Sequence, residues 1–355
     1  MITTLLTISS DASIESQIVP AAKSILSGDL VCCPTETVYG LCANALNPAA
    51  VSRIFHAKGR PSDNPLIVHI SSLEMLSTVA AEVSPYALQL MNHFWPGPIS
   101  FVLPALPSLS STVTGGLNTV AVRMPAHPIM IQLIESTCVP LAAPSANLSG
   151  RPSPTLASHC LEDFNGKVPI IIDGGACSVG IESTVVDVTG ENPLILRPGL
   201  IGYSEISPVF GKILDENLDL NAIKRSPGTR YKHYAPIGDV SLVDDWSAID
   251  VDSLKSNTAF LCSSEFISVL SNLISSLNLK YEVIGLEKSN VIFDHTDILL
   301  IDMGQNCLDF ASGFYLALRK CDEFSISRIF IQKFKENSSI SIALMNRMYK
   351  SAAKE

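Results

Sequence analysis

The chain has 355 residues, of which 47% are hydrophobic and 16% charged, and its formal net charge is -10. A chain of this length usually divides into two domains, and its apolar content excludes an intrinsically disordered protein. The negative charge excludes a broad basic surface for nucleic acid, because neutralising phosphates requires clustered Lys and Arg. Any contact with RNA is therefore expected to be local or transient.

The chain carries no metal-binding or targeting signal. Its nine cysteines are scattered, with no C-x-x-C pair and no repeated ligand spacing, so we expect them to be reduced and to bind no metal. The first twenty residues contain neither a basic residue nor a long apolar run, and no apolar stretch of about 18 residues occurs anywhere. These features predict a cytoplasmic protein without membrane contact.

From residue 14 to about residue 203, apolar runs typical of strands alternate with helical patterns, which predicts an α/β domain. The clearest helix has Asn47 as N-cap and Pro48 as its first residue, and it ends at Gly59. A second helix begins in the same way at Pro85. The order of the strands stays open. Strands are expected at 29–33, 65–70, 98–103, 119–123, 139–143, 169–172, 183–188 and 193–197.

The regularity is lost after this region and returns further on, which predicts two domains joined by a linker. No G-x-G-x-x-G opens a helix in the second region, so dinucleotide binding is not indicated. Strands that alternate with helices there predict a smaller domain on a parallel sheet. The predicted boundaries are 1–205 for the first domain, 206–238 for the linker and 239–355 for the second domain. In the second domain, strands are expected near 240–243, 257–262, 281–285, 297–302 and 327–331, and helices near 264–276, 308–321 and 339–353.

Cations are scarce in the first 200 residues: there are eight, and six of them lie at turns or in the K-x-R segment. In KGRPSDNPLIVH, Lys58 and Arg60 follow a helix, and Asn64 and His69 flank the next strand. A compact ammonium beside a planar guanidinium suits a triphosphate. Cations at the end of a helix also stabilise its dipole without any ligand. Taken alone, this segment leaves both interpretations open.

Two further motifs place polar residues on strands or at their ends. PTETVYG has Thr35 and Thr37 directly after a predicted strand, where α/β proteins bind ligands, although a plain strand end fits as well. NTVAVRMP places Thr119 and Arg123 on one face of a strand. An arginine in an apolar strand needs an anion as partner, either a carboxylate of the protein or one of a substrate.

Small and hydroxylated residues form the next motif, APSANLSGRPSPT, which contains Ser145 and Ser153. Such residues let backbone amides approach a phosphate, although an ordinary Ser/Pro loop fits too. The motif is neither a Walker A loop nor a G-x-S-x-G elbow, which excludes a serine hydrolase of that type. IESTVVD and LILRPG add Ser183 before a strand and Arg197 at a strand end.

In this order, PTETVYGL, KGRPSDNPLIVH, AVRMP, APSANLSGRPSPT, IESTVVD and LRPG resemble the successive motifs of the YrdC-type threonylcarbamoyl-AMP synthases. SPGTRYKHYAP resembles the linker of the longer form of that family, and DFASGFYLALRKCDEF and ALMNRMYKSAA resemble the end of its second domain. The resemblance implies a twisted, mostly parallel α/β sheet followed by a smaller Rossmann-like domain. It also implies an enzyme that makes threonylcarbamoyl-AMP and pyrophosphate from L-threonine, bicarbonate and ATP. A partner transferase would then modify tRNA.

The resemblance implies roles for individual residues, and Mg²⁺ is expected because it accompanies ATP. No general base is identifiable, so catalysis is expected to depend on positioning and electrostatics. L-threonine would contact Thr37, His69, Arg123, Ala143 and Ser183. ATP would contact Arg60, Asn64, Thr119, Ser145, Ser153 and Arg197, with Lys58 and Arg60 as the catalytic cations near the phosphates. A lid over the nucleotide would consist of Tyr231, His233 and Tyr234.

Two other functions compete with this interpretation. A module that binds double-stranded RNA or tRNA without catalysis is disfavoured by the low number of basic residues. Carbamoyl transfer in hydrogenase maturation would require acylphosphatase-like and zinc-finger segments, and the chain has neither.

Overall fold

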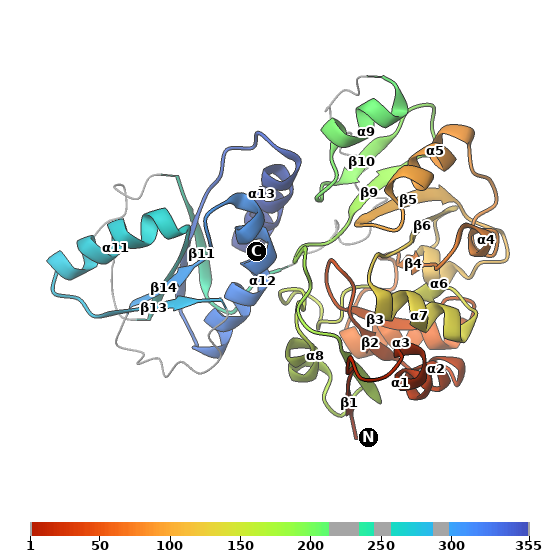
Figure 1. Ribbon diagram of the computed structural model, residues 1–355, viewed down its shortest axis with the longest axis horizontal. Coiled ribbons are helices and arrows are strands. Elements are labelled where there is room, and N and C mark those ends of the chain that lie inside the picture. Colours follow the sequence, from red (N-terminus) through yellow and green to blue (C-terminus); the bar gives the residue numbers. More distant parts are fainter. Residues whose placement is uncertain (1, 213–233, 245–256, 287–297, 354–355) are drawn as a thin grey trace. The chain divides into compact units, whose positions relative to one another are not determined.

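The computed structural model of the chain, shown in Figure 1, describes residues 2–212, 234–244, 257–286 and 298–353. Most of the predicted linker, including Tyr231 and His233, lies outside these residues. The predicted start of the linker, residue 206, lies inside a helix of the first unit. The chain divides into two compact units, the first comprising Met1–Ser149 and Ser153–Tyr231 and the second Gly150–Pro152 and Lys232–Glu355.

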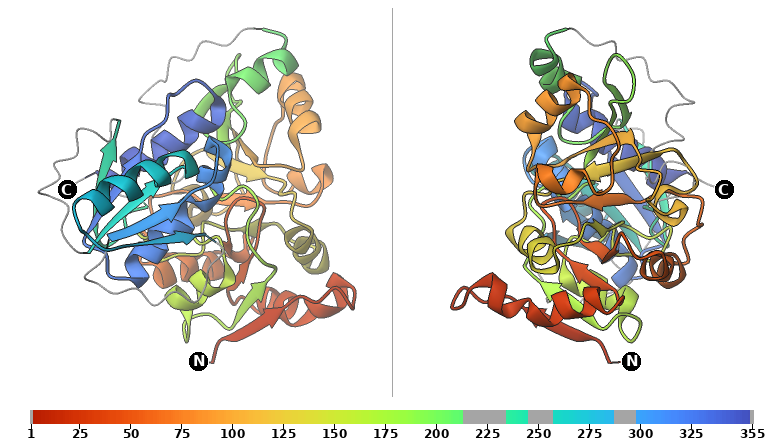
Figure 2. Two further views of the ribbon diagram at one scale, coloured as in Figure 1. Left: turned by 60° about the vertical axis from the view of Figure 1, so that its left-hand side comes forward. Right: turned by 90° about the vertical axis from the view of Figure 1, so that its right-hand side faces the viewer.

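A ten-stranded sheet forms the centre of the first unit, and all eight predicted strands are present in it. The strands are β1 (Thr4–Thr7), β2 (Val31–Cys33), β3 (Gly40–Asn44), β4 (Ile67–His69), β5 (Ile99–Pro104), β6 (Thr119–Arg123), β7 (Leu141–Ala142), β8 (Ile170–Asp173), β9 (Thr184–Asp187) and β10 (Leu194–Arg197). Their spatial order is β1-β8-β2-β3-β7-β4-β6-β5-β9-β10. Two strands were not predicted. β1 is an edge strand with little buried surface, which begins at the N-terminal end in Figure 2, and β3 directly follows a polar turn.

The first sheet is mixed. β1 and β2 both pair with β8 in parallel, as do β4 with β6 and β5 with β9, whereas the other neighbours are antiparallel. Over the two sheets together, parallel pairings predominate among the described residues, because every pairing in the second sheet is parallel. The predicted α/β class is therefore confirmed, with parallel pairing in the majority over the two sheets, whereas the described pairings of the first sheet by itself are four parallel and five antiparallel.

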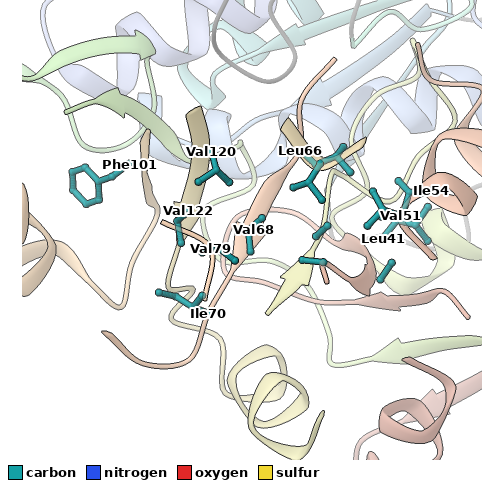
Figure 3. Packing of buried hydrophobic residues seen from close by; sticks show 14 of the residues in the cluster. Leu41, Val51, Ile54, Leu66, Val68, Ile70, Val79, Phe101, Val120 and Val122 are labelled. Atoms are coloured by element: carbon teal, nitrogen blue, oxygen red, sulfur yellow. The ribbon is translucent and has the colours of Figure 1, made fainter. Parts of the chain in front are cut away.

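Helices cover both faces of this sheet, as the alternation of side chains along β2 indicates. Cys32 belongs to the core cluster that includes residues of α3, α5 and α8, whereas its neighbours Val31 and Cys33 belong to the cluster formed with α2 and α7. Figure 3 shows part of the first cluster, with Leu41 of β3 beside Val51 of α3. The helices are α1 (Ile14–Gln17), α2 (Val19–Leu26), α3 (Pro48–Lys58), α4 (Leu73–Leu76), α5 (Pro85–Phe94), α6 (Ser111–Thr114), α7 (Pro128–Thr137), α8 (Ala157–Phe164) and α9 (Tyr203–Phe210).

Helix α3 begins and ends where its sequence predicts. The side chain of Asn47 accepts hydrogen bonds from the amides of Ala49 and Ala50, and Pro48 occupies the first position, where no amide hydrogen is needed. Gly59 ends the helix in the left-handed conformation, with φ of 61°. The start of α5 at its predicted proline is confirmed as well.

The second unit contains a five-stranded sheet in the order β11-β15-β12-β14-β13, in which every pairing is parallel. The strands are β11 (Asp239–Val243), β12 (Thr258–Cys262), β13 (Tyr281–Gly285), β14 (Ile298–Asp302) and β15 (Arg328–Gln332), and the helices are α11 (Ser264–Ser276), α12 (Cys307–Glu323) and α13 (Ser339–Ala352). The predicted smaller, Rossmann-like domain with a parallel sheet is confirmed.

The segment APSANLSGRPSPT, residues 143–155, is called the Ser/Pro loop below. Three of its residues, Gly150–Pro152, belong to this second unit. Buried Arg319 donates to the carbonyl oxygen of Pro152 through Nε at 3.2 Å and Nη2 at 2.8 Å. Among the three predicted lid residues, only Tyr234 is described. It is buried, and its ring lies 5.2 Å from that of Tyr315 within the second unit. Its role as a lid stays a prediction.

All nine cysteines are free, and seven of them are buried. Across the described parts of the chain, no helix combines the length and the apolar character that a membrane crossing requires.

Candidate active site

The first group of predicted residues lies at the ends of neighbouring strands. His69 at the end of β4 and Arg123 at the end of β6 are direct partners in the parallel register. Arg123 donates from Nη1 to the hydroxyl of Thr37 at 2.8 Å and from Nε to the carbonyl oxygen of Gly97 at 3.1 Å. Thr37 is held in a turn after β2, because its amide donates to the side-chain oxygen of Thr35. The structure therefore brings Thr37, His69 and Arg123 together.

Arg123 also pairs with Glu36, which was not predicted from the sequence. Nη2 of Arg123 lies 2.5 Å from Oε1 of Glu36, and both side chains are buried. The contact is an ion pair that lacks the geometry of a hydrogen bond. Of the two anions considered as partners of Arg123, a carboxylate of the protein is therefore present. The planar guanidinium retains further N–H donors that a substrate can use. A carboxylate between two threonines after an apolar strand was the signal that could have found Glu36.

His69 is neutral. Burial, followed by the nearby charge of Arg123, lowers the pKa of His69 to about 3, and its Nδ1 atom is buried without a hydrogen-bond partner. A neutral imidazole offers one donor and one acceptor, which suits a hydroxyl group. Ala143 lies beside the same strand, since its amide donates to the carbonyl oxygen of Ile67 at 3.0 Å.

The second group joins helix α3 to the Ser/Pro loop. Nζ of Lys58 lies 2.5 Å from the carbonyl oxygens of both Ser145 and Asn147, and the amide of Ser149 donates to the carbonyl oxygen of Lys58 at 2.9 Å. The ammonium of Lys58 therefore binds the loop, so the alternative of a simple cation at the helix end does not describe it. Burial, followed by the charge of Arg60, lowers the pKa of Lys58 to about 7.

Two buried residues of α8 hold this loop, one near its middle and one at its C-terminal end. Oδ2 of Asp163 accepts from the amide of Leu148, and Nδ1 of His159 accepts from the amide of Thr155, both at 3.2 Å. The two residues are four positions apart, which places them on the same side of the helix. Sequence reasoning missed both of them. The available signal was a pair of polar residues at i and i+4 on an otherwise apolar helix face.

The pKa of Lys58 predicts a dependence of stability on pH. The folded chain loses this proton above about pH 7, whereas the unfolded chain keeps it up to about pH 10.5, so the unfolded state binds more protons in this window. Stability should therefore rise with pH in this window, by at most about 1.4 kcal/mol per pH unit. Urea unfolding of the wild type and of Lys58→Met from pH 7 to pH 9 tests this. Parallel curves would mean that Lys58 keeps its proton when folded.

The third group connects β9 and β10. Arg197 donates from Nε to the carbonyl oxygen of Ser183 at 3.0 Å and from Nη2 to its hydroxyl at 3.1 Å. The hydroxyls of Ser183 and Ser100 lie 2.9 Å apart, so β5 contributes to the same group. A register shift between β9 and β10 at Arg197 accompanies this arrangement.

The Gly97–Pro98 segment joins the first and third groups. Gly97 accepts from the side chain of Arg123, and the carbonyl oxygen of Pro98 accepts from the amide of Thr184 at 3.0 Å. Just before Ser183, the side chain of Glu182 accepts from the hydroxyl of Ser153 at 2.6 Å. These contacts bring Ser153 and Ser183 to neighbouring positions.

Among the predicted ATP residues, Asn64 lies beside Arg60, and Thr119 is distant from Arg123. Arg60 donates to the carbonyl oxygens of Asn64 at 3.4 Å and Pro65 at 3.1 Å, so its guanidinium contacts the main chain of the loop that follows it in the sequence. Thr119 begins β6, at the opposite end of that strand from Arg123, and is half-buried. The predicted roles of these residues stay predictions.

Substitution of Gly199, which lies next to the third group, is expected to lower the stability of the protein. A Cβ atom at Gly199 would lie 2.4 Å from the amide nitrogen of Thr184 and 2.9 Å from the carbonyl carbon of Ser183. Gly199→Ala should therefore displace the LRPG segment and destabilise the protein by about 1–3 kcal/mol, measured by thermal unfolding. Gly190→Ala is the matched control, because a Cβ there would meet nothing closer than 4.0 Å. Equal melting temperatures for both variants would contradict this.

The three groups are suited to binding and electrostatics rather than to thiol chemistry. Cys177, which lies near Glu36 and Arg123, is protonated at neutral pH because burial raises its pKa to about 12. Within the described ranges, His, Cys, Asp and Glu side chains form no group of three or more that would hold a metal. Buried cations, serine and threonine hydroxyls and a neutral histidine are the chemical resources of the site.

Comparison with known proteins extends over nearly the whole chain. A family model covering the Sua5, YciO and YrdC proteins, described as "Telomere recombination", matches residues 23–199, and the model "Threonylcarbamoyl-AMP synthase, C-terminal domain" matches residues 201–353. The threonylcarbamoyl-AMP synthase of Pyrococcus abyssi is 41% identical over 338 residues, which cover 94% of this chain and 93% of the relative. The Bacillus subtilis enzyme of the same name is 39% identical over 95% of this chain and 93% of its own length.

Solved structures of related proteins are similar to this chain as well. The crystal structure of P. abyssi Sua5 complexed with L-threonine is 39% identical, with a TM-score of 0.79, and the match covers 99% of this chain and 98% of that one. Escherichia coli YciO, at 23% identity and a TM-score of 0.52, shares the fold over 58% of this chain.

The fold and the site define a two-domain YrdC-like enzyme, in which a mixed α/β sheet carries buried cations and hydroxyls at its strand ends and a parallel-sheet domain follows. The relatives specify this class further. The chain belongs to the threonylcarbamoyl-AMP synthase family, in its longer form with the C-terminal domain.

Proposed function

We propose that this enzyme joins L-threonine, bicarbonate and ATP into threonylcarbamoyl-AMP and pyrophosphate, for threonylcarbamoyl-adenosine modification of tRNA. The observation that carries the proposal is the group formed by Thr37, His69 and Arg123, in which a buried cation, a hydroxyl and a neutral imidazole meet. These groups are complementary to the carboxylate and hydroxyl of threonine. The names of the relatives and the threonine bound to P. abyssi Sua5 support the same assignment.

In the amino-acid subsite, Arg123 would bind the carboxylate through the N–H groups that its protein partners leave, and neutral His69 would bind the threonine hydroxyl. Ser183 and the main chain of Ala143 would complete this subsite, since both lie beside its strands. Oriented binding of this kind removes much of the entropic barrier to joining separate reactants.

In the nucleotide subsite, Lys58, Arg60 and Arg197 would neutralise the triphosphate, and Ser145 and Ser153 would donate hydroxyls to it. Fixed cations stabilise charge that develops during adenylyl transfer without reorganising at that moment. Because the pKa of Lys58 is about 7, an approaching phosphate would favour its charged form and restore the proton. Asn64 and Thr119 would contact the rest of the nucleotide.

Mg²⁺ would accompany ATP. Since the described residues bring no three potential ligand side chains together, the ion would be held mainly by phosphate oxygens and water, as Mg²⁺ often is. There it would reduce the charge of the phosphates, while the protein cations orient them.

A separate transferase would consume the adenylate, and with a net charge of -10 any contact with tRNA would be transient. An RNA-binding module without catalysis is not favoured, because the relatives that span the chain are named as synthases. The predicted cytoplasmic location and the lid stay predictions.

Incubation of the purified protein with ATP, Mg²⁺, labelled bicarbonate and L-threonine tests the function. Pyrophosphate should be released only when threonine is present, and label should appear in an adenylate product. RNA binding without threonine-dependent pyrophosphate release would refute the enzyme proposal.

Arg60→Ala tests the assignment of the nucleotide subsite. It should raise the KM for ATP about tenfold or more through loss of a phosphate contact, with little change in the KM for threonine. Steady-state kinetics with each substrate varied in turn measures this. Equal changes in both constants would mean that Arg60 does not belong to the nucleotide subsite.

A further inference from the structure

The carboxylate of Glu36 has an oxygen that the protein leaves without a donor. The structure describes four buried carboxylates in the first unit, and Asp163, Glu182 and Asp187 each accept a hydrogen bond. In Glu36, neither oxygen accepts a hydrogen bond; Oε1 forms the ion pair with Arg123, whereas Oε2 is buried without an ion-pair or hydrogen-bond partner. Leaving a buried charged oxygen without a donor is costly, so a bound molecule that supplies one would be favoured.

The charges around Glu36 specify what kind of group is missing. Arg123 is its ion-pair partner, and the other titratable groups that influence it are Cys177 and His127. Cys177 is protonated, and burial lowers the pKa of His127, so both are neutral near pH 7. The Glu36–Arg123 pair therefore presents one negative and one positive group, and it is complementary to a zwitterion.

An α-amino acid is such a zwitterion. If its carboxylate lies on the free N–H groups of Arg123, its ammonium is separated from that carboxylate by one carbon atom. Glu36 and Arg123 are themselves in contact, so the ammonium can reach the second oxygen of Glu36. Among the buried carboxylates described in this unit, the remaining three are engaged elsewhere.

We infer that Oε2 of Glu36 accepts the ammonium group of L-threonine and takes a proton from it, which makes Glu36 the base of the first chemical step. This inference rests on the proposed function. The N–H bond of the ammonium breaks, its electron pair stays on nitrogen, and the proton forms an O–H bond with Glu36. The neutral amine then attacks the carbon of bicarbonate and a C–N bond forms. The C–O bond to the hydroxyl group breaks, the departing hydroxide takes one proton from the attacking nitrogen, and water leaves with the carbamate as product. Glu36 later returns its proton to solvent.

Glu36→Gln tests this step, because glutamine keeps the size of the side chain but removes the negative charge. At pH 7, kcat for threonine-dependent pyrophosphate release should fall about 10²- to 10⁴-fold, while the Kd for ATP stays unchanged. Raising the pH should restore the rate of the variant by about tenfold per pH unit, because solvent then deprotonates the amine. The wild type should show a much flatter profile.

Asp187→Asn is the matched control, since it neutralises a buried carboxylate at the end of β9, whose Oδ1 accepts hydrogen bonds from the amide and the hydroxyl of Thr189. It should show a pH profile parallel to that of the wild type. A folded Glu36→Gln variant with wild-type kcat, or with a profile parallel to that of the wild type, would overturn the inference. A wild type without any threonine-dependent activity would instead refute the proposed function.

A second measurement does not require the variant to fold. A threonine analogue with a hydroxyl in place of the ammonium should bind the wild type at least about tenfold more weakly than threonine, since the charge-assisted bond to Glu36 is lost. Isothermal titration measures both affinities. Equal affinities would overturn the inference.

Discussion

Arg123→Met is expected to abolish threonine-dependent pyrophosphate release and to destabilise the protein by about 3–5 kcal/mol. The loss of stability arises because Glu36 would stay buried without its cation, and breaking one side of a buried ion pair is more costly than removing both. The loss of activity arises because Arg123 fastens Thr37 and would bind the carboxylate of threonine. Denaturant unfolding and steady-state kinetics measure the two effects.

A double variant separates stability from function. When Glu36→Gln is combined with Arg123→Met, no buried charge is left unpaired, so much of the lost stability should return while activity stays absent. Additive losses of stability in the double variant would mean that the two side chains do not interact. Restored activity would show that Arg123 is dispensable for threonine.

Lys58→Met is expected to lower kcat/KM for ATP by about 10²- to 10³-fold, which corresponds to about 3–4 kcal/mol of transition-state stabilisation. Methionine keeps an unbranched side chain of the same length up to Cε, but it lacks the ammonium, so it cannot bind the carbonyl oxygens of Ser145 and Asn147, nor can it neutralise a phosphate. The substitution would therefore remove both the contact that holds the Ser/Pro loop and the positive charge near the phosphates.

Lys23→Met is the matched control, because Lys23 lies on the exposed surface of α2 and the substitution should leave the kinetics unchanged. The KM for threonine should change little in Lys58→Met, since Lys58 has no contact with the Thr37 group. A Lys58→Met variant that retains more than about a third of the wild-type kcat/KM would contradict the assignment of Lys58 to the phosphates.

Local signals predicted much of the fold because they depend on neighbours in the chain. The start of α3 follows from a side chain that caps nearby amides and a proline that needs no hydrogen bond, and both are visible in the residues themselves. The five strands of the second unit were predicted in the same way, from apolar runs bounded by turns. β1 escaped prediction because it is short and largely exposed, so it shows no clear apolar pattern.

Only some of the residues of the site were predicted from the sequence. Thr37, Lys58, Arg123 and Arg197 stood out because polar and cationic residues are conspicuous in an apolar background. Glu36, Asp163 and His159 did not, since each acts through a partner that is distant in the sequence. Pairing across such distances cannot be deduced from one chain without its strand order.

By itself, the sequence determined the α/β class, the helix ends and the set of motifs that resembles the YrdC-type threonylcarbamoyl-AMP synthases, because propensity, capping and motif spacing are properties of contiguous residues. Only the tertiary structure decided that Arg123 is paired with Glu36 and that Lys58 binds the Ser/Pro loop. The physical reason is that charge pairing, burial and the resulting pKa values depend on which strands become neighbours. In this sheet, β4, β6 and β7 come together from segments separated by dozens of residues.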